Sequence, residues 1–229
     1  MTHDDLSPGW QVWLATPEAA GALDPTSLDA GEQAQWARLW TERRRRDWAA
    51  SRSLLRAVST NTCSARSLSH SHAYAALALA PPLTSVGVDV EWLAPREFVG
   101  MAEIGYSPAE AALIASLAEP GQQRAAFYEL WTLKEACAKA FGLSLVDALH
   151  QCRFVNDGLM WEAEIPSARS WQAIVYAPRP DLRLSLVRVA DPFEPALLPV
   201  AMKEWPSGHA VEWPAVRRFN GPVRSHAAP

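Results

Sequence analysis

The pattern of apolar and polar positions is clearest between Arg124 and Phe141, a stretch that neither Gly nor Pro interrupts. At about 100° per residue, the apolar side chains of this stretch fall on one broad arc. They are Phe127, Leu130, Trp131, Leu133, Cys137, Ala138 and Phe141. The pattern predicts a core helix, and Gly142 stands where a left-handed helix cap is expected.

Charged residues interrupt this arc. Lys134 falls in its middle, although lysine side chains prefer water. Glu135 and Lys139 lie at its edge, four residues apart in the sequence, so their charged groups can meet one turn apart. Taken alone, this pattern is that of a core helix with a surface ion pair.

Elsewhere the pattern predicts short strands and further helices. In Val86–Trp92, three valines alternate with Gly87, Asp89 and Glu91, which is typical of a strand. Other strands are predicted at Gln11–Ala15, His72–Ala80, Cys152–Asn156, Leu159–Glu164, Trp171–Ala177 and Leu182–Val189. Helices are predicted at 29–39 and 42–58, a loop at 60–66, and a capped helix start at Ser107-Pro108-Ala109-Glu110.

The order strand, helix, helix and β-rich segment occurs twice, with a seam near Pro82. Trp48-Ala49-Ala50-Ser51-Arg52 also resembles Trp131-Thr132-Leu133-Lys134-Glu135, although two helices containing Ala and Trp can be alike by coincidence. A genuine repeat predicts an α+β fold of two similar halves, related by pseudo-twofold symmetry, with the active site in the cleft between them. The expected units are residues 1–82, residues 83–190 and an irregular, Pro-rich tail at 191–229.

Composition narrows the classes of protein. The chain has 229 residues, 49% of them hydrophobic and 20% charged, as in a soluble globular protein. Its net charge of −4 gives no bulk attraction to nucleic acid or membrane. Its three cysteines are far apart, which favours reduced thiols over a disulfide or zinc framework. With no signal-peptide core and no run long enough to cross a membrane, we expect a cytoplasmic protein.

Asp89 and Glu91 are the first candidates for chemistry. Two residues apart on a strand, they project from one face, with backbones roughly 6.5–7 Å apart. Gly87 on the same face keeps the surface low, which would let a ligand approach. Two carboxylates so placed can hold a hard cation such as Mg²⁺, although a strand with one solvated face has the same pattern.

Two polar segments could bind phosphate. Ser69-His70-Ser71-His72 supplies hydroxyl and imidazole donors in an expected turn before a strand, where an ordinary loop is the alternative. The run Arg43–Arg46, which includes Arg45, offers guanidinium groups together with Arg52 and Arg56. Such a run is also typical of a solvated helix face. The chain has no Gly-x-x-x-x-Gly-Lys loop, His-Glu-x-x-His, Gly-x-Ser-x-Gly or Gly-x-Gly-x-x-Gly motif.

Two motifs in combination resemble a known family. Gly87-Val88-Asp89-Val90-Glu91, followed some way on by Trp131-x-x-Lys134-Glu135-x-x-x-Lys139, is similar to the signature pair of the 4'-phosphopantetheinyl transferases of the Sfp type. Ser69-His70-Ser71 and Arg52-Ser53-Leu54-Leu55 resemble two further motifs of that family. The similarity extends from about Arg43 to Ala177, and the family fold consists of two similar α+β halves.

The resemblance implies an enzyme that transfers the phosphopantetheine arm of coenzyme A to a serine of an acyl or peptidyl carrier protein. Such carriers serve fatty acid, polyketide or nonribosomal peptide biosynthesis. It implies that Asp89, Glu91 and Glu135 hold Mg²⁺, or Mn²⁺ in its place, and that Glu135 is the candidate base. Lys134 and Lys139 would neutralise pyrophosphate. Coenzyme A would be held at its nucleotide end by Arg45, Arg52, Ser69 and His70, with His70 and an arginine on the 3'-phosphate.

The segment between Leu55 and Ser69 departs from the family. It is short, and it lacks a Lys-Pro element that normally helps to hold the nucleotide; Arg66 is the candidate substitute. We expect a monomer. The alternatives are a non-catalytic module that binds carrier protein or coenzyme A, and a Mg²⁺-dependent phosphohydrolase.

Overall fold

The computed structural model describes residues 9–58, 65–81, 84–156, 161–165, 167, 169–190 and 200–221. It combines helices with mixed sheets, which confirms the α+β class. In chain order the elements are β1 (Gln11–Ala15), η1 (Pro17–Ala22), η2 (Pro25–Ser27), α1 (Ala30–Ala37), α2 (Glu42–Ala57), β2 (Ala65–Ser71), β3 (Tyr74–Ala80), β4 (Ser85–Trp92), α3 (Phe98–Gly105), α4 (Pro108–Ser116), α5 (Pro120–Phe141), α6 (Leu145–Gln151), β5 (Arg153–Asn156), β6 (Trp161–Glu164), β7 (Ser170–Arg179), β8 (Leu182–Ala190), β9 (Ala201–Trp205) and β10 (Ala215–Asn220). None of the helices in these ranges is both long and apolar enough to span a membrane.

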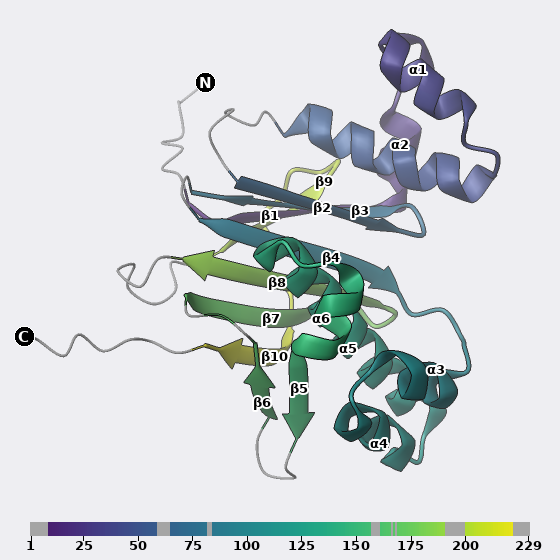
Figure 1. The fold of residues 1–229 in the computed structure, drawn as a ribbon. Coiled ribbons are helices and arrows are strands. Elements are labelled where there is room, and N and C mark those ends of the chain that lie inside the picture. Colours follow the sequence, from purple (N-terminus) through teal and green to yellow (C-terminus); the bar gives the residue numbers. More distant parts are fainter. Residues whose placement is uncertain are drawn as a thin grey trace, which may run out of the picture.

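Two sheets make up the body of the described structure. The first sheet is four-stranded in the order β2-β3-β1-β9, and the second is four-stranded in the order β10-β7-β8-β4. Within the first, β1 pairs antiparallel with β3 and parallel with β9. A small hairpin pairs β5 with β6. Figure 1 shows α2 over the first sheet, and α5 with α6 beside the second.

One core lies between the two sheets. Alternating residues of β1, among them Val12 and Leu14, belong to one buried cluster with Val86, Val88 and Val90 of β4. The opposite face of β4 is covered by α5, and a second cluster fills the space among α3, α4, α5 and the second sheet. Because β4 is buried on both of its faces, its polar residues lie between layers rather than in water.

Helix α5 confirms the strongest sequence prediction. It is 22 residues long and ends at Phe141, with Gly142 in the left-handed conformation at φ 67°. The stretch from Arg124 to Phe141 contains no glycine and carries the apolar arc, which is buried because it faces the second sheet. The capped start at Ser107 is also confirmed, since its side chain and that of Glu110 form a reciprocal capping box at α4.

Three sequence predictions are wrong. Ser69 to Ser71 is the end of strand β2, not part of a turn, and the loop predicted up to residue 66 gives way to this strand at Ala65. The tail beyond 191 is not irregular throughout, because it contains β9, a strand of the first sheet, and β10, a strand of the second. Helices α3 and α6 were not predicted. Residues 191–199 and 222–229 of the predicted tail lie outside the described residues, as does Cys63.

Candidate active site

A row of serine hydroxyls joins the edge of the first sheet to the edge of the second. Alternate residues of β2 point toward β4, so Ser67, Ser69 and Ser71 lie in line and are all buried. Ser69 donates to Oδ1 of Asp89 at 2.6 Å, and Ser71 donates to Oε2 of Glu91 at 2.6 Å. Ser67 accepts a backbone N–H of β4 at 3.0 Å. The two predicted acidic residues are therefore held by hydroxyl donors from the other sheet.

Helix α5 brings a cation to the same place. Lys139 donates to Oδ1 of Asp89 at 2.9 Å and to the carbonyl oxygen of Val88 at 3.0 Å. This contact depends on Gly87, because a Cβ at that position would stand 1.9 Å from the carbonyl oxygen of Ala136 on α5. The close approach of Gly87 serves the helix backbone and not a ligand, which corrects the sequence interpretation.

The electrostatics of this group are unbalanced. Burial raises the pKa of Asp89 above its ordinary value, even though Lys139 and Ser69 oppose the shift. Burial likewise raises the pKa of Glu91 to about 7 against the hydrogen bond from Ser71, and the charge of Asp89 adds to the effect. The pKa of Glu135 is raised by burial and then by Asp89. When ionised, these three carboxyl groups together carry more negative charge than the single positive charge of Lys139 can offset.

The residues present fit a divalent cation. Oδ2 of Asp89 is buried and has no hydrogen-bond partner. A buried carboxylate oxygen without a donor can be stabilised by a bound cation. Asp89, Glu91 and Glu135 supply the oxygen donors that Mg²⁺ prefers. Within the described ranges, no three acidic, His or Cys side chains stand close enough to hold a metal ion as they are. A side chain of this group must therefore move before all three could bind one ion.

Lys134 lies elsewhere. Its side chain is 0% exposed and forms an ion pair with Glu110 of α4 at 3.0 Å. It also donates to the carbonyl oxygens of Leu149 and Cys152, at the end of α6. The same glutamate accepts the backbone N–H of Phe154 through Oε1. The structure therefore contradicts the expected phosphate contact: the lysine in the apolar arc ties α4, α5 and α6 together.

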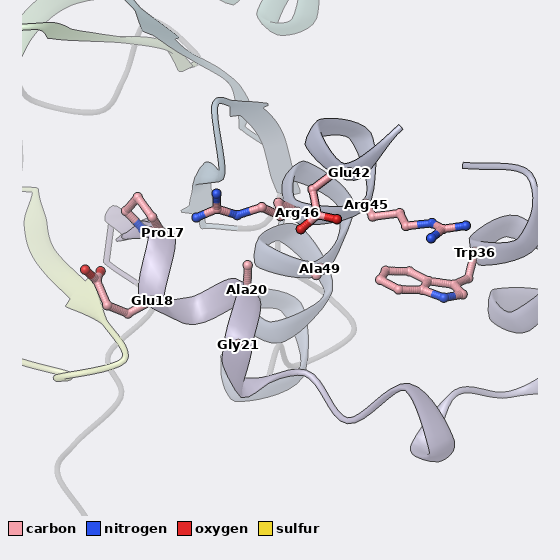
Figure 2. A pocket seen from close by; sticks show the side chains of 9 residues that line it. All are labelled: Pro17, Glu18, Ala20, Gly21, Trp36, Glu42, Arg45, Arg46 and Ala49. Atoms are coloured by element: carbon pink, nitrogen blue, oxygen red, sulfur yellow. The ribbon is translucent and has the colours of Figure 1, made fainter. Parts of the chain in front are cut away.

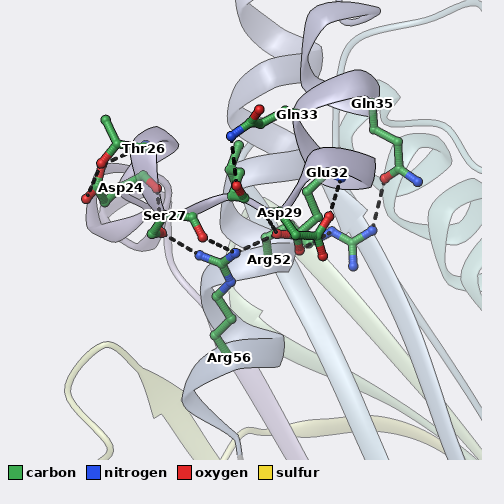
Figure 3. A network of polar contacts seen from close by, with 10 residues as sticks. Asp24, Thr26, Ser27, Asp29, Glu32, Gln33, Gln35, Arg52 and Arg56 are labelled. Atoms are coloured by element: carbon green, nitrogen blue, oxygen red, sulfur yellow. Dashed lines mark hydrogen bonds and ion pairs between the residues drawn. The ribbon is translucent and has the colours of Figure 1, made fainter.

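Arg52 is engaged by helix α1. Its guanidinium lies 3.8 Å from Oε1 of Glu32, donates to Gln35 at 3.1 Å and covers the ring of Trp48. Glu32 also binds Arg56, so that one carboxylate stands between two arginines of α2 (Figure 3). The carboxylate of Glu32 therefore lies beside the Arg52 guanidinium, which the family resemblance placed at the nucleotide end of coenzyme A.

Arg45 lines a cavity of about 470 Å³ formed by η1, α1 and α2. It points toward Trp36, while Arg46 extends toward Glu18 on the other side (Figure 2). Arg45 also donates to the carbonyl oxygen of Leu39 at 2.9 Å. The predicted nucleotide arginines are thus apart from Asp89, and no hydrogen bond or ion pair among the described residues joins them to it.

Ser69 and His70 do not share a face. Ser69 is buried against Asp89, whereas His70 is exposed, as alternation along a strand requires. The turn predicted here instead consists of His72 and Ala73, both with positive φ. The contact of Ser71 with Glu91 was missed by the sequence interpretation, although the alternating serines of β2 were a signal for it.

One comparison with known proteins bears on this site. Residues 85–175 match the model of the 4'-phosphopantetheinyl transferase superfamily. This part of the chain is therefore similar to a domain of that superfamily, which supports phosphopantetheine transfer in general. No curated protein matches the chain. Asp89, Glu91, Glu135 and Lys139 lie inside the matched range, and the predicted nucleotide residues Arg45, Arg52, Ser69 and His70 lie before it.

Proposed function

Because residues 85–175 match the 4'-phosphopantetheinyl transferase superfamily, we propose that this chain moves the 4'-phosphopantetheine arm of coenzyme A to a serine of an acyl or peptidyl carrier protein. One observation carries the proposal. Asp89 holds Lys139 on one carboxylate oxygen and leaves the other buried without a partner. A phosphoryl-transfer site needs cations around the transferred group. Asp89 already holds the Lys139 ammonium, and its second oxygen could bind a metal cation.

The reaction exchanges one phosphate bond for another. The serine oxygen of the carrier attacks the phosphorus that bears the pantetheine arm, and a phosphodiester forms. The pyrophosphate P–O bond breaks, and 3',5'-bisphosphoadenosine leaves with the bonding electrons. The serine proton must pass to a base, for which a group with a pKa near the working pH is best suited.

Glu135 is the proposed base. Burial and the charge of Asp89 raise its pKa, which makes it a better proton acceptor than an ordinary carboxylate. It is half-buried, so an incoming hydroxyl can reach it. Lys139, whose side chain is 30% exposed, can turn its ammonium to the pyrophosphate as charge develops on the leaving group.

A divalent cation, Mg²⁺ by preference, would be held by Asp89, Glu91 and Glu135 and would supply positive charge next to the pyrophosphate oxygens. Ser69 and Ser71 orient two of these carboxylates through their hydroxyl donors. Of the residues expected at the nucleotide end, Ser69 is the one in direct contact with this group. Lys134 is left out of the proposed site because its ammonium is buried against Glu110.

The test is to incubate the chain with coenzyme A and Mg²⁺, with and without apo carrier proteins, and to follow both products. Transfer predicts that 3',5'-bisphosphoadenosine and phosphopantetheinylated carrier appear together and in equal amounts. Carrier or coenzyme A binding without either product would identify a non-catalytic module. Phosphate release from small nucleotides without any carrier would identify a phosphohydrolase.

A further inference from the structure

The turn between β2 and β3 has an unusual sequence for its conformation. It consists of His72 and Ala73, at φ 51° and φ 66°, and it joins the paired residues Ser71 and Tyr74. Two-residue hairpin loops with positive φ at both positions usually contain Asn-Gly or Asp-Gly. Other residues kept in such conformations cost stability and cluster at functional sites. The backbone N–H of Ala73 donates to the carboxylate of Asp47 on α2, and the side chain of His72 has a contact of its own.

The imidazole of His72 lies beside the hydroxyl of Ser71. Nδ1 of His72 is 3.2 Å from Oγ of Ser71. The same hydroxyl donates to Oε2 of Glu91 at 2.6 Å and accepts the backbone N–H of Trp92 at 3.3 Å. A serine hydroxyl has one proton and two lone pairs. Since its proton goes to the ionised carboxylate, the contact with His72 requires that Nδ1 donates. A chain of hydrogen bonds therefore runs from His72 through Ser71 to Glu91.

Aromatic neighbours hold the imidazole in this position. The ring centroids of His72 and Trp92 are 6.1 Å apart. Trp92 is in turn stacked on Tyr74, with ring centroids 6.1 Å apart and an interplanar angle of 15°. Burial, followed by the charge of Arg43, lowers the pKa of His72, so the ring is uncharged at pH 7 and carries one N–H. The geometry at Ser71 places that proton on Nδ1.

Glu91 depends on a single side-chain donor, unlike the neighbouring Asp89. Asp89 accepts hydrogen bonds from Ser69 and from Lys139. Among the described residues, Ser71 is the one hydrogen-bond donor to the Glu91 carboxylate, and it holds Oε2. Without a donor at His72, the Ser71 hydroxyl could rotate and give its proton to another acceptor. The carboxylate of Glu91 would then lose the contact that fixes its orientation.

We propose that His72 is a positioning residue, which directs the Ser71 hydroxyl to Glu91 so that this carboxylate is oriented to bind a divalent cation. The inference rests on the proposed function, because it takes Glu91 as a cation ligand. Hydrogen-bond partners behind a metal ligand orient that ligand and raise its affinity for the metal. This role differs from the phosphate contact that the polar segment Ser69–His72 suggested in the sequence.

Two substitutions separate the hydrogen bond from the shape of the turn. His72→Gly adopts positive φ freely but has no side-chain donor. His72→Asn also tolerates positive φ, and its amide N–H can take the place of Nδ1–H. The test is titration of the metal-free chain with Mn²⁺, with the free ion measured by electron paramagnetic resonance. The dissociation constant should rise about fivefold in His72→Gly, as for the loss of one hydrogen bond, and His72→Asn should restore the wild-type value.

A double-mutant cycle shows whether His72 acts through Ser71. Ser71→Ala should weaken Mn²⁺ binding at least as much as His72→Gly, and adding His72→Gly to Ser71→Ala should change nothing further. His209→Ala is the matched control, because it removes an exposed imidazole from the segment between β9 and β10; it should leave the affinity for Mn²⁺ unchanged. Thermal midpoints of all variants check that each one is folded.

Equal affinities of wild type and His72→Gly would overturn the inference, as would additive effects in the cycle. An equal loss in His72→Asn and His72→Gly would overturn it too, because the donor would then be irrelevant, and so would a wild type that binds no Mn²⁺. A chain that transfers phosphopantetheine while its Mn²⁺ affinity ignores residue 72 would refute the role of His72 alone. A chain with the expected Mn²⁺ affinities that transfers nothing would refute the proposed function and leave this role standing.

Discussion

At the residue scale, the acidic group around Lys139 is built for a charge that the protein itself does not supply. Asp89 is 4% exposed and keeps one oxygen without a partner, and the pKa of Glu91 is raised to about 7. Both features are unfavourable for the folded protein without a divalent cation beside these carboxylates, because Lys139 offsets only part of their charge. A site that accepts stability loss in this way is typical of function rather than of packing.

The raised pKa of Glu91 makes stability fall with rising pH. Its folded pKa is about 7 and its ordinary value is 4.5, so the folded state holds more protons than the unfolded state between these pH values. The free energy of unfolding of metal-free protein should therefore decrease as pH rises through this window, by up to about 3 kcal/mol from this group. Urea titrations at a series of pH values would measure it.

In Glu91→Gln, the same decrease should be clearly smaller, because the titrating group is gone. Adding Mg²⁺ at pH 7 should stabilise wild type more than the variant if Glu91 contributes to cation binding. An identical pH dependence in the two proteins would show that the Glu91 carboxyl titrates near its ordinary value.

Lys134 offers a prediction that separates stability from catalysis. Lys134→Met leaves the buried carboxylate of Glu110 without its partner, so the free energy of unfolding should drop by roughly 3–5 kcal/mol. Adding Glu110→Gln should recover part of the loss, because the uncompensated charge is removed. Denaturant titration measures both. A Lys134→Met protein of normal stability that no longer transfers phosphopantetheine would instead support the phosphate contact expected from the sequence.

At the element scale, the site depends on how closely α5 approaches β4. Gly87 allows the carbonyl of Ala136 to lie where a Cβ would be, and this brings Lys139 within hydrogen-bond distance of Asp89. The serines of β2 complete the arrangement from the other side. A helix, an edge strand of each sheet and one glycine therefore fix the relative positions of the acidic group and its cation.

Gly87→Ala should separate α5 from β4. The added methyl group would stand 1.9 Å from a backbone oxygen, which no side-chain rotation can relieve. We expect a loss of about 3 kcal/mol or more in the free energy of unfolding, beyond the usual cost of overpacking. Gly121→Ala is the control within the same helix, since nothing lies within 4 Å of its added Cβ; it should be neutral or slightly stabilising. Equal thermal midpoints for the two variants would contradict this account of the close approach.

The sequence was sufficient for α5 and for the start of α4. The arc of α5, its glycine cap and the capping box at Ser107 follow from local patterns, and the structure confirms all three. Strand β2 was missed because Ser67, Ser69 and Ser71 are buried by hydrogen bonds to β4 instead of by apolar contacts. The partner of Lys134 could not be predicted either, because the contact depends on how α4 packs against α5.

At the scale of the whole molecule, the chain closes its two sheets with strands from its C-terminal part. β9 pairs with β1 and β10 pairs with β7, so each sheet receives one strand from beyond residue 200. Trp213 is buried in the core between the sheets, and Phe219 belongs to the core beneath α5. These strands were not predicted, because the recurrent prolines of this part of the sequence indicated an irregular tail. The pseudo-twofold relation between the halves stays a prediction.

Removing the C-terminal strands should therefore abolish cooperative folding. A chain ending at residue 190 would expose the edges of β1 and β7 and remove two aromatic side chains from the cores. Circular dichroism during heating should show a broad or absent transition, against a sharp one for the full chain. A sharp transition within a few degrees of that of the full chain would show that β9 and β10 are peripheral to the fold.

The central claim is that Asp89, Glu91, Glu135 and Lys139 form a phosphopantetheine transfer site. Intact-mass spectrometry of an apo carrier protein, incubated with coenzyme A, Mg²⁺ and either wild type or Glu135→Gln, tests it most directly. Glu103→Gln, an exposed change on α3, serves as the control. Wild type and control should both convert the carrier, while Glu135→Gln keeps its fold and leaves the carrier unmodified. Conversion by Glu135→Gln at the wild-type rate, or none by wild type with any of several carriers, would contradict the claim.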